Sequence, residues 1–263
     1  MNKGQTIVVG AGVVLLLLLY FVLDTKPEKQ KTVEKTRALA AESTDLNALL
    51  PAAKTSLDAV SAGEIAALEQ GLNRSEDDSV RVGLLKQLSG RWYQAGQPAI
   101  AGGYAQQVAE QLQTEEAWSI AGTTFAICLQ TIQEEKVRTY CTRRAIAAFE
   151  NAISLDPANI AHRVNLALCY AENPPSENPM QGITMLLELN QQHPDNVLIL
   201  NSLARLAIKT GQYDRAKERL EAAYAKNAQN PNTVCMLAQV YEALGDNTRA
   251  TAFAQQCEQL NNQ

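Results

Sequence analysis

Residues 201–216 read NSLARLAIKTGQYDRA, and residues 235–250 read CMLAQVYEALGDNTRA, which repeats the pattern thirty-four positions later. The clearest matches in this register are Leu203 with Leu237, Gly211 with Gly245, Ala216 with Ala250, and Ala223 with Cys257. Counting back by the same interval from Leu220 reaches Leu186, which indicates a third copy. A period of about 34 residues is typical of helical solenoids, in which each repeat is a pair of antiparallel helices. The sequence therefore predicts an all-α fold.

Small and large apolar residues are distributed along these repeats in a way that suits paired helices. Small side chains are expected where two helices approach most closely, and large ones where space remains to be filled. The small positions are Ala204, Ala216, Ala223, Ala238 and Ala250, and the large ones are Leu203, Tyr213, Leu220, Leu237 and Tyr241. Because one helix pair cannot bury its apolar face alone, we expect neighbouring repeats to complete the core.

The chain before these repeats is less regular but still helical in pattern. We predict degenerate helical repeats over residues 61–113 and regular ones over residues 114–263, giving five helix pairs in all. Gly102 and Gly103 either weaken their helix or allow a neighbouring helix to approach closely. Three prolines within residues 173–179 exclude a continuous helix there and predict a stiff turn.

One stretch near the N-terminus has the composition of a membrane helix. Residues 6–23 carry no charge and would span about 27 Å as a helix, which suffices for a hydrocarbon core. We expect a short tail at residues 1–5, a transmembrane helix at 6–23, and a charged stalk or helical linker at 24–60. A cleaved signal peptide is the alternative, although no small-residue cleavage site directly follows the apolar run and the one at residues 38–40 lies too far downstream.

The positive charges beside this helix predict its orientation. Few of them precede it, whereas five follow it closely: Lys26, Lys29, Lys31, Lys35 and Arg37. The positive-inside rule therefore places the large C-terminal part in the cytoplasm. The alternative, if the organism is bacterial, is a periplasmic solenoid attached to the inner membrane.

The cysteines are odd in number and widely spaced. They are Cys128, Cys141, Cys169, Cys235 and Cys257, and no two form a C-x-x-C motif. This spacing gives little support for a disulfide framework or a zinc site. We expect buried free thiols that pack as small hydrophobic residues, which agrees with a reducing compartment.

Several motifs resemble those of the tetratricopeptide repeat family. Leu-Ala-x-x-Ala at 203–207 and Leu-Ala-x-x-Tyr at 237–241 are similar to that family's Leu-Gly-x-x-Tyr core. Residues 211–216 resemble its turn between helices, and residues 153–157 resemble its repeat ending. The resemblance covers residues 115–260 well and residues 80–113 weakly.

This resemblance implies both a fold and a mode of action. The family's fold is a right-handed α-solenoid of antiparallel helix pairs, here expected behind one transmembrane helix. The first helices of successive pairs would line a concave surface that accepts an extended peptide or a partner's helix. Two departures, Gly182 and Cys257 in place of alanines, put individual repeat boundaries in doubt but not the fold.

Five polar residues are candidates for a peptide-binding groove. Asn201, Arg205 and Lys209 recur every four residues on one predicted helix, on the face away from Leu203. Asn232 and Gln239 occupy comparable positions in the next repeat. Two cations accompanied by amides could hold a carboxylate or an acidic segment. The alternative is that these residues form an ordinary solvated face.

The sequence offers no motif for catalysis, metal binding or cofactor binding. The two histidines, His162 and His193, have no partner at metal-ligand spacing, and no phosphate-binding or nucleophile motif is present. We therefore expect no cofactor, no metal and no enzymatic activity. A cysteine-dependent enzyme using Cys141, with two arginines close by, is the remote alternative. The net charge of -5 gives no indication of nucleic-acid binding.

These observations predict a membrane-anchored scaffold that recruits a protein or peptide partner. A self-assembling structural protein or a periplasmic chaperone-like assembly factor is the alternative. Self-assembly would use the last helix, where no further helix is expected to cover the apolar residues Ala250, Phe253, Ala254 and Cys257.

Overall fold

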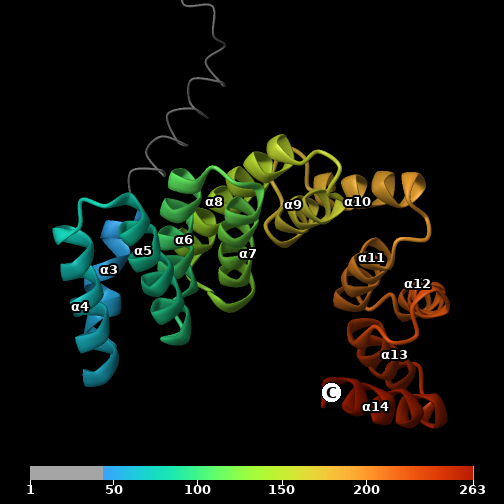
Figure 1. The fold of residues 1–263 in the computed structure, drawn as a ribbon. Coiled ribbons are helices and arrows are strands. Elements are labelled where there is room, and N and C mark those ends of the chain that lie inside the picture. Colours follow the sequence, from blue (N-terminus) through green and yellow to red (C-terminus); the bar gives the residue numbers. More distant parts are fainter. Residues whose placement is uncertain (1–43, 263) are drawn as a thin grey trace, which may run out of the picture. The chain divides into compact units, whose positions relative to one another are not determined.

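The computed structural model describes residues 44–262, and within them the chain is entirely helical. The chain divides into two units, residues 1–45 and 46–263, and the second contains every helix described here. The twelve helices (Figure 1) are α3 (Leu46–Thr55), α4 (Ala59–Arg74), α5 (Asp78–Gln94), α6 (Pro98–Leu112), α7 (Glu115–Thr131), α8 (Glu135–Leu155), α9 (Ile160–Glu172), α10 (Gln181–Gln192), α11 (Val197–Lys209), α12 (Tyr213–Lys226), α13 (Pro231–Ala243) and α14 (Asn247–Asn261). The absence of strands among the described residues confirms the all-α prediction.

Helices that follow one another in the chain pack against each other from α4 to α14. The pairs are α5 with α6, α7 with α8, α9 with α10, α11 with α12, and α13 with α14 (Figure 1). The first helices of the last four pairs also contact one another in sequence order. This is the packing expected of stacked helix pairs, whereas the right-handed sense of the solenoid stays a prediction.

The packed unit begins earlier than residue 61. Ala53 of α3 and Ile65 of α4 are buried in one cluster with Trp92 of α5. Helix α3 also packs against α6. Residues 46–60, which the sequence places in a stalk, therefore belong to the helical core.

The turn within a pair has the same geometry in the regular and in the degenerate repeats. Gly211 and Gly245 have φ values of 71° and 79°, and Gly96, between α5 and α6, has a φ of 72°. In each turn the residue after the glycine donates its backbone N–H to a carbonyl five residues earlier, as Gln97 does to Trp92 at 2.9 Å. Because L side chains rarely adopt this positive φ, glycine closes all three helices. The α5–α6 pair is thus built like the later pairs.

Close helix approach depends on glycines that receive side chains of the next helix. A Cβ atom at Gly102 of α6 would lie 2.6 Å from the ring of Phe125 of α7. A Cβ atom at Gly122 of α7 would lie 2.8 Å from the ring of Phe149 of α8. Both phenylalanines are fully buried. Of the two interpretations of Gly102, the structure supports close approach.

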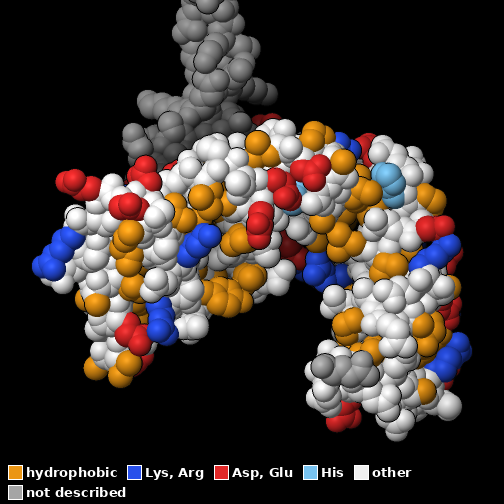
Figure 2. Space-filling view, viewed as in Figure 1, with side chains coloured by type: hydrophobic (Ala, Val, Ile, Leu, Met, Phe, Trp, Pro, Cys, Tyr) orange, Lys and Arg blue, Asp and Glu red, His pale blue; other side chains and the backbone are white. Residues whose placement is uncertain are grey.

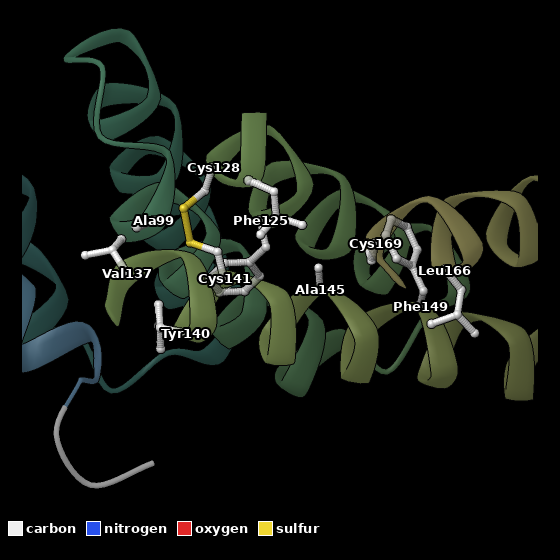
Figure 3. Close-up of a cluster of buried hydrophobic side chains, with 11 residues drawn as sticks. Ala99, Phe125, Cys128, Val137, Tyr140, Cys141, Ala145, Phe149, Leu166 and Cys169 are labelled. Atoms are coloured by element: carbon white, nitrogen blue, oxygen red, sulfur yellow. A yellow bond between two sulfur atoms is a disulfide. The ribbon is translucent and has the colours of Figure 1, made fainter. Parts of the chain in front are cut away.

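Four of the five cysteines form disulfides, so the prediction of free thiols was wrong for all but Cys169. Cys128 of α7 is bonded to Cys141 of α8 (Figure 3), with 6.2 Å between their Cα atoms. Cys235 of α13 is bonded to Cys257 of α14, with 5.0 Å between Cα atoms. Cys169 remains free and buried.

The pairing follows from the antiparallel geometry of a helix pair. Two residues face each other when they lie equally far from the turn that joins the helices. Cys235 and Cys257 lie eleven residues on either side of Asp246, which precedes α14. Cys128 and Cys141 lie six and seven residues from Glu134, which precedes α8. A search for short cysteine motifs does not detect this relation.

None of the helices between residues 44 and 262 is both long enough and apolar enough to cross a bilayer. The predicted transmembrane helix at 6–23 lies outside the described residues, as do the N-terminal tail and residues 24–43.

Among the described glycines, Gly182 leaves the least room for an added methyl group. A Cβ atom at Gly182 of α10 would lie 2.3 Å from the carbonyl oxygen of Ala167 and 2.5 Å from the backbone nitrogen of Ala171, both in α9. Gly182→Ala should therefore lower the free energy of unfolding by about 1–3 kcal/mol, because backbone atoms must move to make room. Chemical unfolding followed by circular dichroism measures this change.

Gly83→Ala is the matched control, since a Cβ atom there would have no neighbour within 4 Å and Gly83 lies inside α5. It should stabilise the chain by about 0.5–1 kcal/mol through the lost flexibility of glycine. Equal effects of the two substitutions would contradict the proposed contact between α9 and α10.

Candidate peptide-binding groove

The first helices of three successive pairs line a shallow groove. We call it the α7–α9–α11 groove, and its volume is about 130 Å³. Its lining consists of Thr123, Ala126, Ile127, Leu129, Gln130, Phe149, Asn165, Leu168, Cys169, Glu172 and Arg205. Helix α9 packs against both α7 and α11, which holds the three walls together.

Helical spacing selects the residues that line the groove. Helix α9 contributes Asn165, Leu168 and Glu172, which are three and four positions apart and so share one face of the helix. Fully buried side chains, among them the ring of Phe149, lie beneath. Exposed polar side chains of α7, Thr123 and Gln130, lie at the edge. The groove therefore combines an apolar base with a polar rim.

The charged groups of this groove differ in their pairing. The carboxylate of Glu172 accepts a hydrogen bond from Nζ of Lys209 at 2.6 Å. Arg205 is exposed, and its side chain has no hydrogen-bond or ion-pair partner among the described residues. The groove thus presents one unpaired cation to a ligand.

Of the five residues predicted for the groove, Arg205 is the one that lines it. Lys209 lies at the end of α11, where it pairs with Glu172. Asn232 and Gln239 are exposed on α13, away from this lining. Peptide binding by the five residues stays a prediction.

Asn201 has a structural position that the sequence does not indicate. The residue is 8 % exposed, and its side-chain Nδ2 donates to Oγ1 of Thr233 at 2.9 Å. The Thr233 hydroxyl donates to Oδ1 of Asn201 at 3.0 Å, and the Thr233 backbone N–H donates to Oδ1 of Asn230 at 3.0 Å. Asn230 is the N-cap of α13. Asn201 therefore joins α11 to the start of α13 instead of facing solvent.

The groove residues that sequence reasoning missed come from α7 and α9. Thr123, Gln130 and Asn165 do not stand out by residue type. Their signal is positional, since each lies on the first helix of a pair, on the side that faces the neighbouring first helices. To find them from the sequence, one needs the helix boundaries of the pairs α7–α8 and α9–α10 as well as those of the last two pairs.

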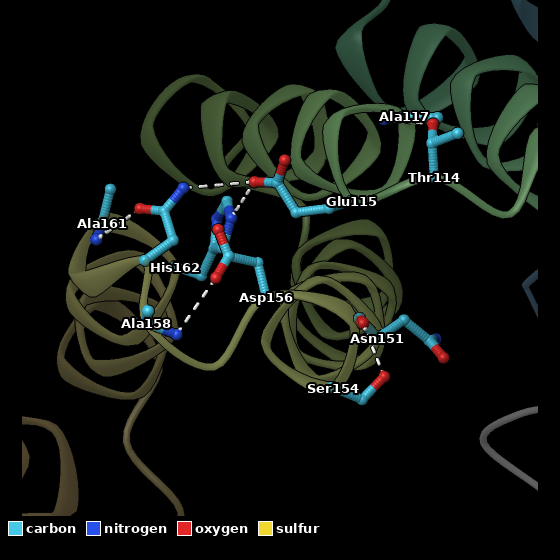
Figure 4. A network of polar contacts seen from close by, with 10 residues as sticks. Thr114, Glu115, Ala117, Asn151, Ser154, Asp156, Ala158, Ala161 and His162 are labelled. Carbon is cyan, nitrogen blue, oxygen red and sulfur yellow. Dashed lines mark hydrogen bonds and ion pairs between the residues drawn. The ribbon is translucent and has the colours of Figure 1, made fainter.

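His162 connects the same helices at their other end. Its side chain is 3 % exposed, and its Nε2 contacts the Glu115 carboxylate (Figure 4). Asn159, the N-cap of α9, donates from Nδ2 to the same carboxylate at 3.2 Å. These contacts hold the start of α9 against the start of α7. Within residues 44–262, no group of three or more His, Cys, Asp or Glu side chains is placed to hold a metal ion.

The structure overturns the candidate cysteine nucleophile. Cys141 is fully buried, and its sulfur is bonded to that of Cys128. The free Cys169 is also buried; burial and, secondarily, the charge of Glu172 raise the pKa of its thiol to about 12. A thiol with so high a pKa is almost entirely protonated near neutral pH and is a poor nucleophile.

Helix α14 is held against α13 by an aromatic contact and a disulfide. The ring of Phe253 stacks on that of Tyr241 with centroids 5.6 Å apart, and Cys257 is cross-linked to α13. The exposed residues of α14 are polar or small, including Gln255, Glu258 and Gln259. On the face drawn in Figure 2, hydrophobic, acidic and basic side chains are interspersed. Homo-oligomerisation through α14 stays a prediction.

Comparison with known proteins identifies the repeat. A tetratricopeptide repeat family model matches residues 207–258, which span the end of α11, all of α12 and α13, and most of α14. No curated protein matches the chain. The family match confirms the predicted resemblance for this stretch.

Two solved structures illustrate the structural similarity. One is TTC0263, a thermophilic TPR protein of Thermus thermophilus, with 17% identity and a TM-score of 0.49 over 68% of this chain and 91% of that chain. The other is MamA, from residue 41 to its end, of Desulfovibrio magneticus RS-1, with 14% identity and a TM-score of 0.41 over 69% of this chain and 95% of that chain.

The buried position of Asn201 predicts a stability defect upon truncation. Asn201→Ala leaves the Thr233 hydroxyl without its partner in α11 and should lower the free energy of unfolding by about 1–3 kcal/mol. Asn232→Ala, on the exposed face of α13, should change it by less than about 0.5 kcal/mol. Denaturant titration of both variants measures the difference, and similar values for the two would show that the contact is not stabilising.

Proposed function

We propose that this chain is a membrane-attached adaptor that holds a segment of a partner protein in the α7–α9–α11 groove and catalyses no reaction. The observation that carries the proposal is the unpaired Arg205 on the rim of a groove built from first helices. The repeat match at residues 207–258 supports a fold whose family binds protein segments. Residues 6–23 would provide the attachment to the membrane.

The groove indicates what kind of segment would fit. Side-chain and backbone amides of an extended segment could pair with Thr123, Gln130 and Asn165, while small apolar side chains cover Leu168. A carboxylate on the segment would pair with Arg205, where a charge-assisted hydrogen bond adds about 1.5–3 kcal/mol. The groove is shallow, with a volume of about 130 Å³, and therefore suits an extended segment better than a bulky side chain.

Site-specific cross-linking tests the groove. A photoreactive amino acid at Thr123, in the full chain in its own membranes, should form adducts with a partner. Arg205→Glu should reduce these adducts by about tenfold, because the removed interaction corresponds to about 1.4 kcal/mol or more. Lys136→Glu, an exposed cation of α8 outside the groove, should leave them unchanged. Adducts that persist with Arg205→Glu would rule the groove out.

For the compartment we propose the oxidising side of the membrane, against the orientation that the positive charges favour. The proposal rests on the two disulfides, since such bonds are rare in reducing compartments. A cytoplasmic location would agree with reduced cysteines, but four of the five cysteines are in disulfides. The distribution of lysines after residue 23 remains the opposing observation.

Alkylation in intact cells tests the compartment. A membrane-permeant maleimide is added to intact cells and kept present while the chain is denatured without reductant. It should label one cysteine per chain, Cys169. Cys235→Ser should raise the count to two, because Cys257 loses its partner. Mass spectrometry of the purified chain gives the count. Labelling of all five cysteines of the unsubstituted chain, without added reductant, would place the repeats in a reducing compartment.

A further inference from the structure

A second, larger groove lies on the other side of α11, formed with α10 and α12. We call it the α10–α12 groove, and its volume is about 460 Å³. The residues that matter to its chemistry are Met180, Ile183 and Leu187 at α10, Leu206 of α11, and Arg215 and Arg219 of α12. It differs from the α7–α9–α11 groove in its walls, which come from second helices of pairs.

One wall of this groove is an apolar stripe that solvent reaches. Met180, Ile183 and Leu187 are three and four positions apart, so they follow one face of α10. Met180 is 55 % exposed and Leu187 is 41 % exposed. Leu206 of α11 continues the apolar surface across the base. Exposed apolar residues gathered along one groove are typical of interaction sites.

The opposite wall is a row of positive charge. Arg215 and Arg219 are four positions apart on α12, and neither has an ion-pair partner among the described residues. Arg215 donates to Oε1 of Gln212 at 2.8 Å, and Arg219 donates to the Leu203 carbonyl at 3.2 Å. No aspartate or glutamate of the described residues lines the groove. Both guanidinium groups therefore keep donors and charge for a ligand.

The electrostatics of Arg219 agree with this. Burial and, next, the positive charge of Arg215 lower the pKa of Arg219, and Glu218 offsets part of the effect. Because no acidic side chain from residues 44–262 lines the groove, the charges of the two arginines are not balanced within it. Lys209, at the edge, is already paired with Glu172.

The local packing explains why the groove exists. The junction between α10 and α11 is less extensively packed than the other junctions between successive pairs. Helix α10 has twelve residues and begins only after the proline-containing segment 173–179. Helices α10 and α12 each pack on α11, and the surface of α11 between them is left open.

We propose that the α10–α12 groove binds an amphipathic helix of a partner protein, with aliphatic side chains on one face and carboxylates beside them. The apolar stripe and the arginine row are carried by two helices on either side of one base, which is the arrangement that recognises a helix lying in a groove. Carboxylates four positions apart on that helix match the four-residue spacing of Arg215 and Arg219. A fatty acid, with one carboxylate, would leave one of the two arginines without a partner.

A designed peptide provides the probe. A fluorescein-labelled, 14-residue alanine-based peptide carries Leu at intervals of three and four and two Glu residues four apart. Fluorescence anisotropy measures its binding to the purified full chain. Arg215→Glu should weaken binding by about tenfold or more, and replacing both peptide Glu residues with Lys should weaken it similarly. Leu187→Ser should also weaken it.

The controls separate this proposal from the one for the other groove. Lys217→Glu lies on α12 outside the groove lining and should change the affinity less than about twofold. Arg205→Glu should also leave peptide binding unchanged, because Arg205 lines the other groove.

Three results would overturn the proposal. The first is that the acidic peptide does not bind at about 1 mM, a concentration at which weak association is still measurable. The second is that the acidic and basic peptides bind equally. The third is that the Arg215→Glu variant binds the acidic peptide unchanged. Saturable binding of oleate that displaces the acidic peptide and is lost with Arg215→Glu would assign the groove to a lipid instead. A concentration-dependent mass abolished by Arg215→Glu would assign it to a second copy of the chain.

Discussion

The contact on which the helical core depends is the close approach of one helix to the next at positions without a side chain. The ring of Phe125 occupies the space above Gly102, and the ring of Phe149 occupies the space above Gly122. Helix α7 thus places a ring in the space left by α6 and leaves a space that a ring of α8 occupies. At Gly182 the approach is closer still, because the neighbouring atoms belong to the backbone of α9. Dispersion attraction stabilises such contacts fully only when no void remains between the atoms. Both rings are fully buried, in agreement with this requirement.

This mode of packing determines where a ligand can lie. Each second helix fills the space between two first helices on one side of the stack, and the first helices then approach one another on the other side. Their facing side chains become a continuous surface whose composition is free to vary, since the core is supplied by other faces of the same helices. The α7–α9–α11 groove is such a surface. Thr123, Gln130 and Arg205 stabilise no buried contact in it.

The sequence predicts those features that recur at a fixed interval. The thirty-four-residue period and the glycines of the turns are sufficient for the all-α fold, because each is a local requirement of a helix pair. The exposure of Arg205 is predictable for the same reason, because it follows from the position of this residue on a first helix. Asn201 is misplaced because its partner, Thr233, lies thirty-two residues away in the next pair. The disulfides are missed because they join residues related by the turn between two helices, a relation invisible to motif spacing.

Helix α11 lies between the two grooves, and its sequence shows how one helix serves both. Arg205 and Leu206 are consecutive, so their side chains diverge by about 100° around the helix axis. One lines the α7–α9–α11 groove and the other lines the α10–α12 groove. The remaining faces of α11 are buried against its neighbours through Ile199, Leu200 and Ala204. Both disulfides lie inside other pairs, α7 with α8 and α13 with α14, and so do not cross the weakly packed junction between α10 and α11. The position of α11 against α10 is therefore maintained by noncovalent contacts, and it is there that the α10–α12 groove opens.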